Sequence, residues 1–302
     1  MSIPFRRDDT LAHGAVEDTA PLVRRVLCNN PSAFTFRGTN SYVIGRGRVA
    51  VLDPGPANAE HLAAILAAVR GETVSHVIVS HTHRDHSPNA RALAEATGAP
   101  MLGFAPHLTP AGEGGEGGDH DFIPDRRVAD GEIIQGDGWR LTALHTPGHC
   151  GNHLCFALDD AAGAPTGTLF SADHVMSWST SVVGPPDGNM AAYMHSLARL
   201  RGRDDRLLLP GHGPAITDPA PFLAALAAHR QEREDLVRAA LGATGQATAE
   251  ELVGPVYGPL DPRLVGAAGR SLLAHLLKLE AEGIVRRMSP GSPTWRLAYE
   301  QK

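Results

Sequence analysis

The feature that most constrains this chain is a cluster of metal-ligand side chains directly after an apolar run. Residues 74–80 (VSHVIVS) have the composition of a buried strand. Within the next six residues come His81, His83, Asp85 and His86. Neutral imidazoles and carboxylates are the ligands that zinc and similar divalent ions prefer. We therefore expect a metal site on the rigid base that this strand provides.

Three more ligand-type residues follow later segments that are also predicted to be strands. The segments 139–144, 168–172 and 206–209 have strand-like patterns, and they are followed in turn by His149, Asp173 and His212. Strands of one sheet can end at a common edge, where binding sites are generally found. Taken singly, the two histidines would also fit turns, and the aspartate would fit a helix cap.

The seven side chains suit two divalent metal ions, with zinc as the expected metal. We assign His81, His83 and His149 to one ion, Asp85, His86 and His212 to the other, and Asp173 to a bridging position. Asp85 is also the expected catalytic residue, because a carboxylate in such a site can orient the attacking hydroxide. Sites with two metals activate water and stabilise negative charge on a substrate. The expected chemistry is therefore hydrolysis.

The composition fits an ordinary soluble protein. The chain has 302 residues, 42% of them hydrophobic and 20% charged, enough for one large domain or a large and a small one. A net charge of −6 argues against a broad basic surface that would hold long nucleic acids. Three cysteines give no disulfide framework, and we find no signal segment and no membrane span. We expect a cytoplasmic protein without membrane association; the sequence does not specify its oligomeric state.

The patterns divide the chain into four parts. Residues 1–20 lack periodicity and are expected to form a poorly ordered arm, whereas residues 21–218 alternate predicted strands and helices around the ligand residues. Residues 219–244 predict a connecting helix. Residues 245–302 combine helices with a terminal hairpin, which is the order of elements in a winged-helix domain.

Two segments outside the ligand cluster have further candidate roles. The Gly-rich acidic segment 107–121 is expected to be a flexible surface loop in which His107 and His120 are solvated. In the connecting helix, we select as candidate substrate-binding residues a polar patch formed by His229, Arg230 and Arg233. The alternative for this patch is a solvated helix face.

The ligand pattern resembles the signature of the metallo-beta-lactamase superfamily, His-x-His-x-Asp-His followed by a distant His, an Asp and a final His. The resemblance implies an α/β protein with an αββα sandwich, a dinuclear and usually zinc-containing site at the sheet edge, and hydrolysis of an ester, thioester, amide or phosphodiester. Branches that cleave lactams commonly have Cys or Ser where this chain has Asp173. We therefore do not expect a true beta-lactamase.

The C-terminal part indicates which family within the superfamily this chain resembles. Together with residues 38–42 (GTNSY) and 276–283 (LLKLEAEG), it is similar to the beta-lactamase-like protein 2 family, which joins the hydrolase domain to a small winged-helix domain. That resemblance implies either a single-stranded RNA endoribonuclease, as in an animal member, or a thioesterase, as in fungal relatives. The expected fold is thus an αββα metallo-beta-lactamase sandwich with a small C-terminal winged-helix domain.

The function expected from these residues is a metal-dependent hydrolase in which a dinuclear site with a bridging hydroxide cleaves an ester, thioester or phosphodiester. Its substrate would be a small ester or thioester, or single-stranded RNA. The alternatives are an endoribonuclease, a glyoxalase II-like thioesterase, and a non-enzymatic winged-helix nucleic-acid binder with a structural metal site. Residues 245–302 contain seven Lys or Arg against six Asp or Glu, so their near-neutral charge gives little support to nucleic-acid binding.

Overall fold

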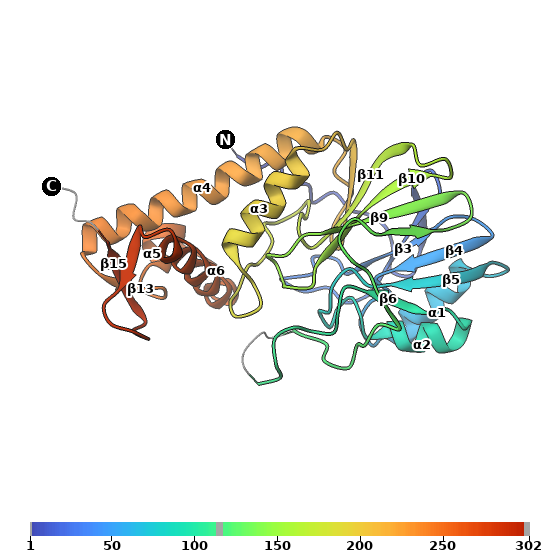
Figure 1. The fold of residues 1–302 in the computed structure, drawn as a ribbon, viewed down its shortest axis with the longest axis horizontal. Helices are drawn as coiled ribbons and strands as arrows, with labels where there is room; N and C mark the ends of the chain where they lie inside the picture. Colours follow the sequence, from blue (N-terminus) through green and yellow to red (C-terminus); the bar gives the residue numbers. More distant parts are fainter. Residues whose placement is uncertain (1, 113–116, 299–302) are drawn as a thin grey trace.

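The computed structural model describes residues 2–112 and 117–298, and two β-sheets packed face to face form its main body (Figure 1). The first sheet has seven strands, which follow one another in chain order. They are β1 (Val16–Ala20), β2 (Val23–Leu27), β3 (Asn40–Ile44), β4 (Arg48–Leu52), β5 (Thr73–Ile78), β6 (Met101–Gly103) and β7 (Arg126–Arg127). Pairing is antiparallel from β1 to β4 and parallel from β4 to β7. The carboxyl ends of β4 and β5 therefore lie at the same edge.

The second sheet has five strands in the order β12-β11-β10-β9-β8. They are β8 (Ile133–Gln135), β9 (Trp139–His145), β10 (Leu154–Asp160), β11 (Pro165–Ala172) and β12 (Leu207–Pro210). Pairing is antiparallel except between β11 and β12, which are parallel. Because β11 and β12 run in the same direction, the residues that follow them also share one edge of the sheet.

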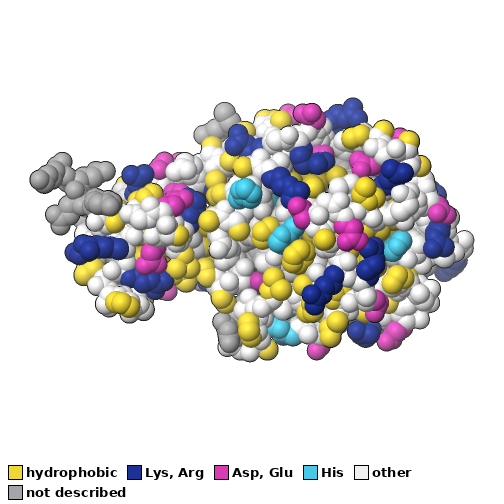
Figure 2. Space-filling model, viewed as in Figure 1, with side chains coloured by type: hydrophobic (Ala, Val, Ile, Leu, Met, Phe, Trp, Pro, Cys, Tyr) yellow, Lys and Arg dark blue, Asp and Glu magenta, His cyan; other side chains and the backbone are white. Residues whose placement is uncertain are grey.

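Helices cover the outer face of each sheet. Helices α1 (Ala59–Ala68) and α2 (Asn89–Thr97) pack on the first sheet, and α3 (Met190–Arg201) and the first part of α4 (Pro219–Thr244) pack on the second. The main body is therefore an αββα sandwich. On the face of the described residues that Figure 2 shows, basic and acidic side chains are interspersed, as the modest net charge predicts.

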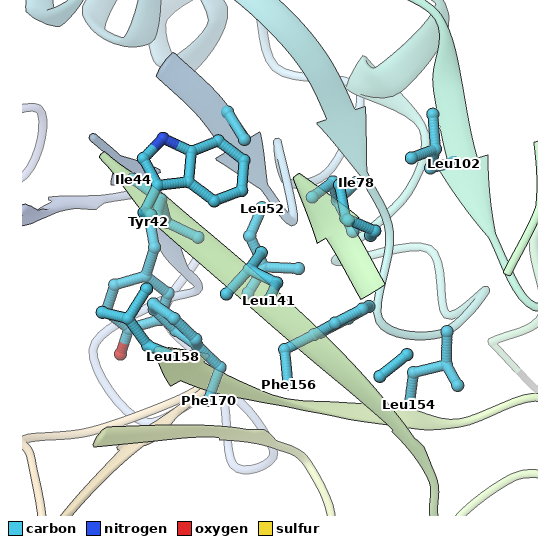
Figure 3. Close-up of a cluster of buried hydrophobic side chains, with 14 of the residues drawn as sticks. Tyr42, Ile44, Leu52, Ile78, Leu102, Leu141, Leu154, Phe156, Leu158 and Phe170 are labelled. Carbon is cyan, nitrogen blue, oxygen red and sulfur yellow. The ribbon is translucent and has the colours of Figure 1, made fainter. Parts of the chain in front are cut away.

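The main core lies between the two sheets (Figure 3). Strand β10 shows how the sequence builds it. Leu154, Phe156 and Leu158 alternate into the core between the sheets, whereas Cys155 and Ala157 face the cluster under α3 and α4. Both faces of this strand are covered, which explains its continuous apolar sequence.

The C-terminal part has a small core of its own. A three-stranded sheet of β13 (Ala247–Thr248), β15 (Thr294–Leu297) and β14 (Val285–Arg287) packs with α5 (Val253–Tyr257) and α6 (Pro262–Ala281). Leu272, Leu276 and Leu279 lie on one face of α6 and pack in a cluster with Trp295 and with Leu241 from the end of α4. Helices followed by a hairpin form the winged-helix arrangement expected from the sequence.

Helix α4 links the two parts, beginning in the main body and ending in the C-terminal part (Figure 1). Its bounds agree with the connecting helix predicted for residues 219–244. The division into units at residues 21–218, 219–244 and 245–302 stays a proposal, and residues 299–302 lie outside the described residues. None of the helices in residues 2–112 and 117–298 is both long and apolar enough to cross a membrane.

The prediction of a poorly ordered N-terminal arm is wrong for residues 2–20. Residues 16–20 form β1, which pairs with β2. Before it, the amide of Arg6 donates to the carbonyl of Ser177 at 2.8 Å, and Asp9 forms a buried ion pair with Arg25, with Oδ1 2.8 Å from Nη2. Polar contacts attach this segment to the main body, so its lack of apolar periodicity was misleading.

Candidate metal centre

The first ligand group lies just beyond the end of β5. After this strand the chain turns back on itself, and the amide of His86 donates to the carbonyl of His83 at 2.9 Å. The turn places Nε2 of His81 3.1 Å from Nδ1 of His83. His149, in the loop after β9, places its Nε2 2.9 Å from the same Nδ1 atom. Three ring nitrogens therefore meet at one point, and they belong to the residues predicted for the first ion.

The second ligand group lies beside the first. His212 follows β12, and its Nε2 is 3.3 Å from Nε2 of His86 and 3.2 Å from Oδ2 of Asp85. The third separation in this group, between Nε2 of His86 and Oδ2 of Asp85, is 3.7 Å. The group matches the set predicted for the second ion and contains both nitrogen and oxygen ligands.

Asp173 lies between the two groups. It directly follows β11, and its Oδ2 is 3.3 Å from Nε2 of His212 and 3.7 Å from Nε2 of His149. Its Oδ1 is 3.5 Å from Nε2 of His86, is buried, and makes no hydrogen bond within the described residues. A carboxylate in contact with both groups is in the position that a bridging ligand requires.

Glycine is needed beside this carboxylate. A Cβ atom at Gly211 would lie 2.3 Å from Oδ1 of Asp173 and 2.7 Å from Cε1 of His86, both far inside contact distance. The Gly-His-Gly segment that carries His212 therefore passes against both ligand groups because residue 211 has no side chain.

Hydrogen bonds on the far side of the rings select the tautomer of four histidines. Nδ1 of His86 lies 3.0 Å from Oδ2 of Asp53, and Nδ1 of His81 lies 2.9 Å from Oγ of Ser80, whose hydroxyl donates to Asp53. Nδ1 of His149 and of His212 face the carbonyls of Val182 and Gly38, at 2.6 Å and 3.1 Å. Each acceptor requires a proton on Nδ1, which leaves the lone pair on Nε2 directed at the ligand cluster.

The electrostatics of the cluster suit bound cations. Burial, reinforced by His149, lowers the pKa of His83 to about 3, so its ring is neutral at physiological pH. Burial also lowers the pKa of His212, but the carboxylates of Asp173 and Asp85 outweigh burial and raise it to about 9, so a bound cation would take the place of the proton on Nε2. Burial raises the pKa of Asp85, yet His86 and His212 hold it below its ordinary value. The two carboxylates thus stay ionised and stabilise positive charge between them.

The residues present therefore fit a divalent metal centre. Converging imidazole nitrogens, tautomers set by outer hydrogen bonds and a carboxylate oxygen without another partner are the features of such a site. His83 and His149 of the first group, Asp85 of the second, and Asp173 also line a cavity of about 710 Å³. Further parts of its wall come from the N-terminal segment, residues 32–35, the loop around Trp178, and helices α4, α5 and α6.

Of the three candidate substrate-binding residues, two line this cavity and one does not. His229 and Arg230 of α4 line it, whereas Arg233 does not. Instead, Arg233 donates from Nη1 to the carbonyl of Val256 and lies over the Tyr257 ring at 5.1 Å, so it holds α5 against α4. The structure thus brings two of these residues toward the ligand groups and gives Arg233 a packing position.

Sequence reasoning missed two aspartates near the ligands. Asp53 follows β4, so the rule that found the other strand-end residues also applied to it. Asp187 lies in a loop before α3 that carries no pattern, and its Oδ2 is 3.9 Å from Nε2 of His83 and 3.9 Å from Nε2 of His107. Oδ2 of Asp187 and Nε2 of His107 are both buried without a hydrogen-bond partner among the described residues.

The expectation that His107 is solvated is therefore wrong. Its side chain is 1% exposed, and its Nδ1 is 2.8 Å from the hydroxyl of Thr82, beside the ligand turn. His120 is exposed, as expected. Residues 113–116 of the same predicted loop lie outside the described residues.

Comparison with known proteins identifies the family. A model of the metallo-beta-lactamase superfamily matches residues 34–212, and a model of the beta-lactamase associated winged helix domain matches residues 248–295. The chain belongs to the metallo-beta-lactamase superfamily. The match spans the whole ligand cluster, and it confirms the predicted αββα hydrolase fold with a C-terminal winged-helix domain.

Relatives and solved structures agree with this assignment. The chain is 31% identical to the lactamase-like protein notP of Aspergillus sp. (strain MF297-2), over 89% of this chain and 84% of the relative. It is also 31% identical to an atrochrysone carboxyl ACP thioesterase of Aspergillus chevalieri, over 80% of this chain and 75% of the relative. A beta-lactamase domain protein from Burkholderia ambifaria shares the fold, with a TM-score of 0.78, 23% identity and 97% coverage of both chains. The predicted enzyme class, a hydrolase of the metallo-beta-lactamase fold, is thus confirmed.

Proposed function

We propose that this chain is a metal-dependent thioesterase in which the seven ligand residues hold two divalent ions. The observation that carries the proposal is the meeting of a three-histidine group and an Asp/His/His group, joined by Asp173, beside a cavity with many apolar side chains. Such a cavity suits an acyl group. The relatives named as thioesterases support the choice of a thioester over other substrates. Zinc stays the expected metal.

In the proposed hydrolysis, the residues of the chain have two roles: they bind the ions and they orient the attacking water. Bound divalent ions would supply Lewis acidity toward the negative charge that develops on the carbonyl oxygen. Asp85 is 29% exposed toward the cavity, whereas Asp173 is 8% exposed, so Asp85 is the carboxylate placed to orient a water molecule toward the substrate. Water addition would form a carbon–oxygen bond, break the carbon–sulfur bond and release a carboxylic acid and a thiol.

Other substrates are less well supported by the site. In a nucleic-acid binder, the long helix of the C-terminal part would have to face its ligand, yet α6 packs against α3 and α4 and lines the cavity with Leu264 and Ala268. These side chains are apolar, so they have no group that could donate a hydrogen bond to a phosphate. Single-stranded RNA and a thioester of the glyoxalase II type are therefore included among the substrates of the test below.

The test combines metal analysis with a panel of substrates. We expect the purified chain to contain a divalent transition metal and to hydrolyse an acyl thioester faster than a glutathione thioester of the glyoxalase II type, bis-p-nitrophenyl phosphate, single-stranded RNA or a lactam. A chelator should abolish the activity, and His149→Ala and Asp85→Ala should lower metal content and activity at least about tenfold. His195→Ala, an exposed histidine on α3, is the control. Wild-type protein without a transition metal, or with equal activity after chelation, would refute the proposal.

A further inference from the structure

Charge is distributed unevenly along the cavity beside the ligand groups. Among the described residues that line it, the carboxylates are Asp85 and Asp173, and both belong to the ligand groups. The other charged side chains in the lining are all basic: Arg84, Arg230 and Arg270. This asymmetry occurs in a chain whose net charge is −6. Among the described lining residues, the charges away from the predicted metal ligands are therefore carried by arginines.

Arg230 is the most informative of these arginines because it is buried. Its exposure is 2%, its Nη2 donates to the carbonyl of Ser181 at 2.5 Å, and its guanidinium lies 4.9 Å from the Tyr193 ring centre. Within residues 2–112 and 117–298, its Nε has no hydrogen-bond partner and no carboxylate forms an ion pair with it. By contrast, the buried side chain of Arg25 is paired with Asp9.

A buried cation without a counter-charge is unfavourable, so a bound anion would offset its cost. The position of Arg230 shows where that anion would lie. Arg230 binds the carbonyl of Ser181, and His149 of the first ligand group binds the next carbonyl, that of Val182, at 2.6 Å. An anion at the guanidinium would therefore sit close to the reacting end of the cavity.

We propose that Arg230 recognises an anionic group of the substrate, a carboxylate or a phosphate. The proposal rests on the thioesterase function proposed above and names its substrate class. The anion has two possible sources, an acidic acyl group or a phosphate on the thiol that leaves. Both would place negative charge against the same guanidinium, and probes that carry the charge on one side of the thioester at a time distinguish them.

The first measurement needs only the wild-type chain loaded with metal. The matched probes are the N-acetylcysteamine thioesters of 4-carboxyphenylacetic and 4-carbamoylphenylacetic acid, which have the same shape and differ in charge. The coenzyme A thioester of the carbamoyl acid carries phosphate on the leaving group instead. We expect kcat/KM to be about 10- to 100-fold higher for at least one anionic probe than for the neutral probe. Equal kcat/KM for all three probes would overturn the proposal.

The second measurement assigns the preference to Arg230. Arg230→Met should lower kcat/KM for the preferred anionic probe to a larger extent than for the neutral probe, so that the ratio between them falls toward one, and Arg230→Lys should restore part of the preference. Arg238→Met removes an exposed positive charge from the same helix and should keep the wild-type preference. A preference that persists in a folded Arg230→Met protein would refute the assignment. If no probe is hydrolysed by wild type, the thioesterase function itself has failed.

Discussion

At the scale of single residues, the least expected feature of the metal centre is Asp187. His83 differs from the other ligand histidines because its Nδ1 faces the ligand group, which leaves Nε2 to donate elsewhere. Nε2 of His83 is 3.9 Å from Oδ2 of Asp187, a separation that one bridging water spans. Oδ1 of Asp187 meanwhile accepts from the amide of Gly151 at 3.2 Å. Asp187 is thus placed to orient His83.

We expect Asp187→Asn to weaken divalent metal binding about 10- to 100-fold, because the amide keeps one acceptor and replaces the other with a donor. Competition with a chromogenic chelator measures the affinity, and the absorption spectrum of the cobalt-substituted protein reports the geometry. Asp205→Asn is the matched control, since its side chain is 8% exposed against 7% for Asp187 and pairs with Arg203. If both variants bind metal like wild type, Asp187 has no positioning role.

Gly211 offers a second test at this scale. Gly211→Ala would place a methyl group 2.3 Å from Oδ1 of Asp173, so the bridging carboxylate or the loop must move. We expect at least about a tenfold loss of metal affinity, measured by titration of the metal-depleted protein. Gly266→Ala is the control, because a Cβ at Gly266 of α6 meets no atom within 4 Å. Unchanged affinity in a folded Gly211→Ala protein would contradict the assigned position of Asp173.

The residues proposed as ligands could be selected from the sequence because each directly or closely follows a strand with a strong local pattern, and the fold brings them close together. Asp53 obeys the same rule and was overlooked because Pro54 and Gly55 indicated only a strand end. The positions of Asp187 and His107 could not be predicted, since both are set by contacts with residues distant in the chain, such as Thr82. Local pattern thus selects the candidate metal ligands, whereas the groups that contact them from behind depend on tertiary packing.

At the scale of elements, the strands and helices with regular apolar patterns were predictable, and polar contacts decided the exceptions. Strand β1 has no buried face in its first three residues, so nothing in its own sequence indicates a strand. Pairing with β2 and the Asp9–Arg25 ion pair determine its course. Helix α6 shows the opposite case, because its leucines predict the helix and the face that it buries.

The packing of α4 on α6 should depend on pH. Lys278 Nζ and His275 Nδ1 of α6 lie 2.8 Å and 3.2 Å from the carboxylate of Glu234 on α4, whose side chain is 5% exposed. Burial raises the pKa of Glu234, but these hydrogen bonds outweigh burial and hold the pKa below its ordinary value of 4.5. A carboxyl whose pKa is lowered by folding stabilises the fold above its unfolded pKa, and this contribution is lost as the pH falls through the folded pKa.

Glu234→Gln should therefore lower the free energy of unfolding by about 1–3 kcal/mol at pH 7, since hydrogen bonds to charged groups are lost. The difference from wild type should shrink below a pH of about 4, where the wild-type carboxyl also becomes neutral. Urea unfolding of the wild type and of Glu234→Gln, at pH 7 and at a pH below about 4, measures the free energies of unfolding. Glu232→Gln, an exposed position on the same helix, should have little effect. A difference that is the same at both pH values would show that charge is not responsible.

At the scale of the whole molecule, the cavity depends on both parts of the chain. The sandwich supplies the ligand groups, and the C-terminal part supplies a wall that includes Tyr257 of α5 and Leu264, Ala267 and Ala268 of α6. Helix α4 contributes to the cores of both parts, so it couples the position of that wall to the metal centre (Figure 1). In this chain the winged-helix domain therefore forms part of the cavity beside the candidate metal centre.

This arrangement predicts that the C-terminal part limits the size of the acyl group that the cavity accepts. Ala267→Trp would fill part of the cavity from α6, so kcat/KM for a bulky arylacetyl thioester should fall at least about tenfold, as steric exclusion from a pocket predicts. The value for the acetyl thioester and the metal content should stay at wild-type levels. Val265→Trp, on the exposed side of the same helix at 43% exposure, should leave both thioesters unaffected. If Ala267→Trp kept its metal and the ratio of kcat/KM for the two thioesters stayed at the wild-type value, the C-terminal wall would have no part in selecting the acyl group.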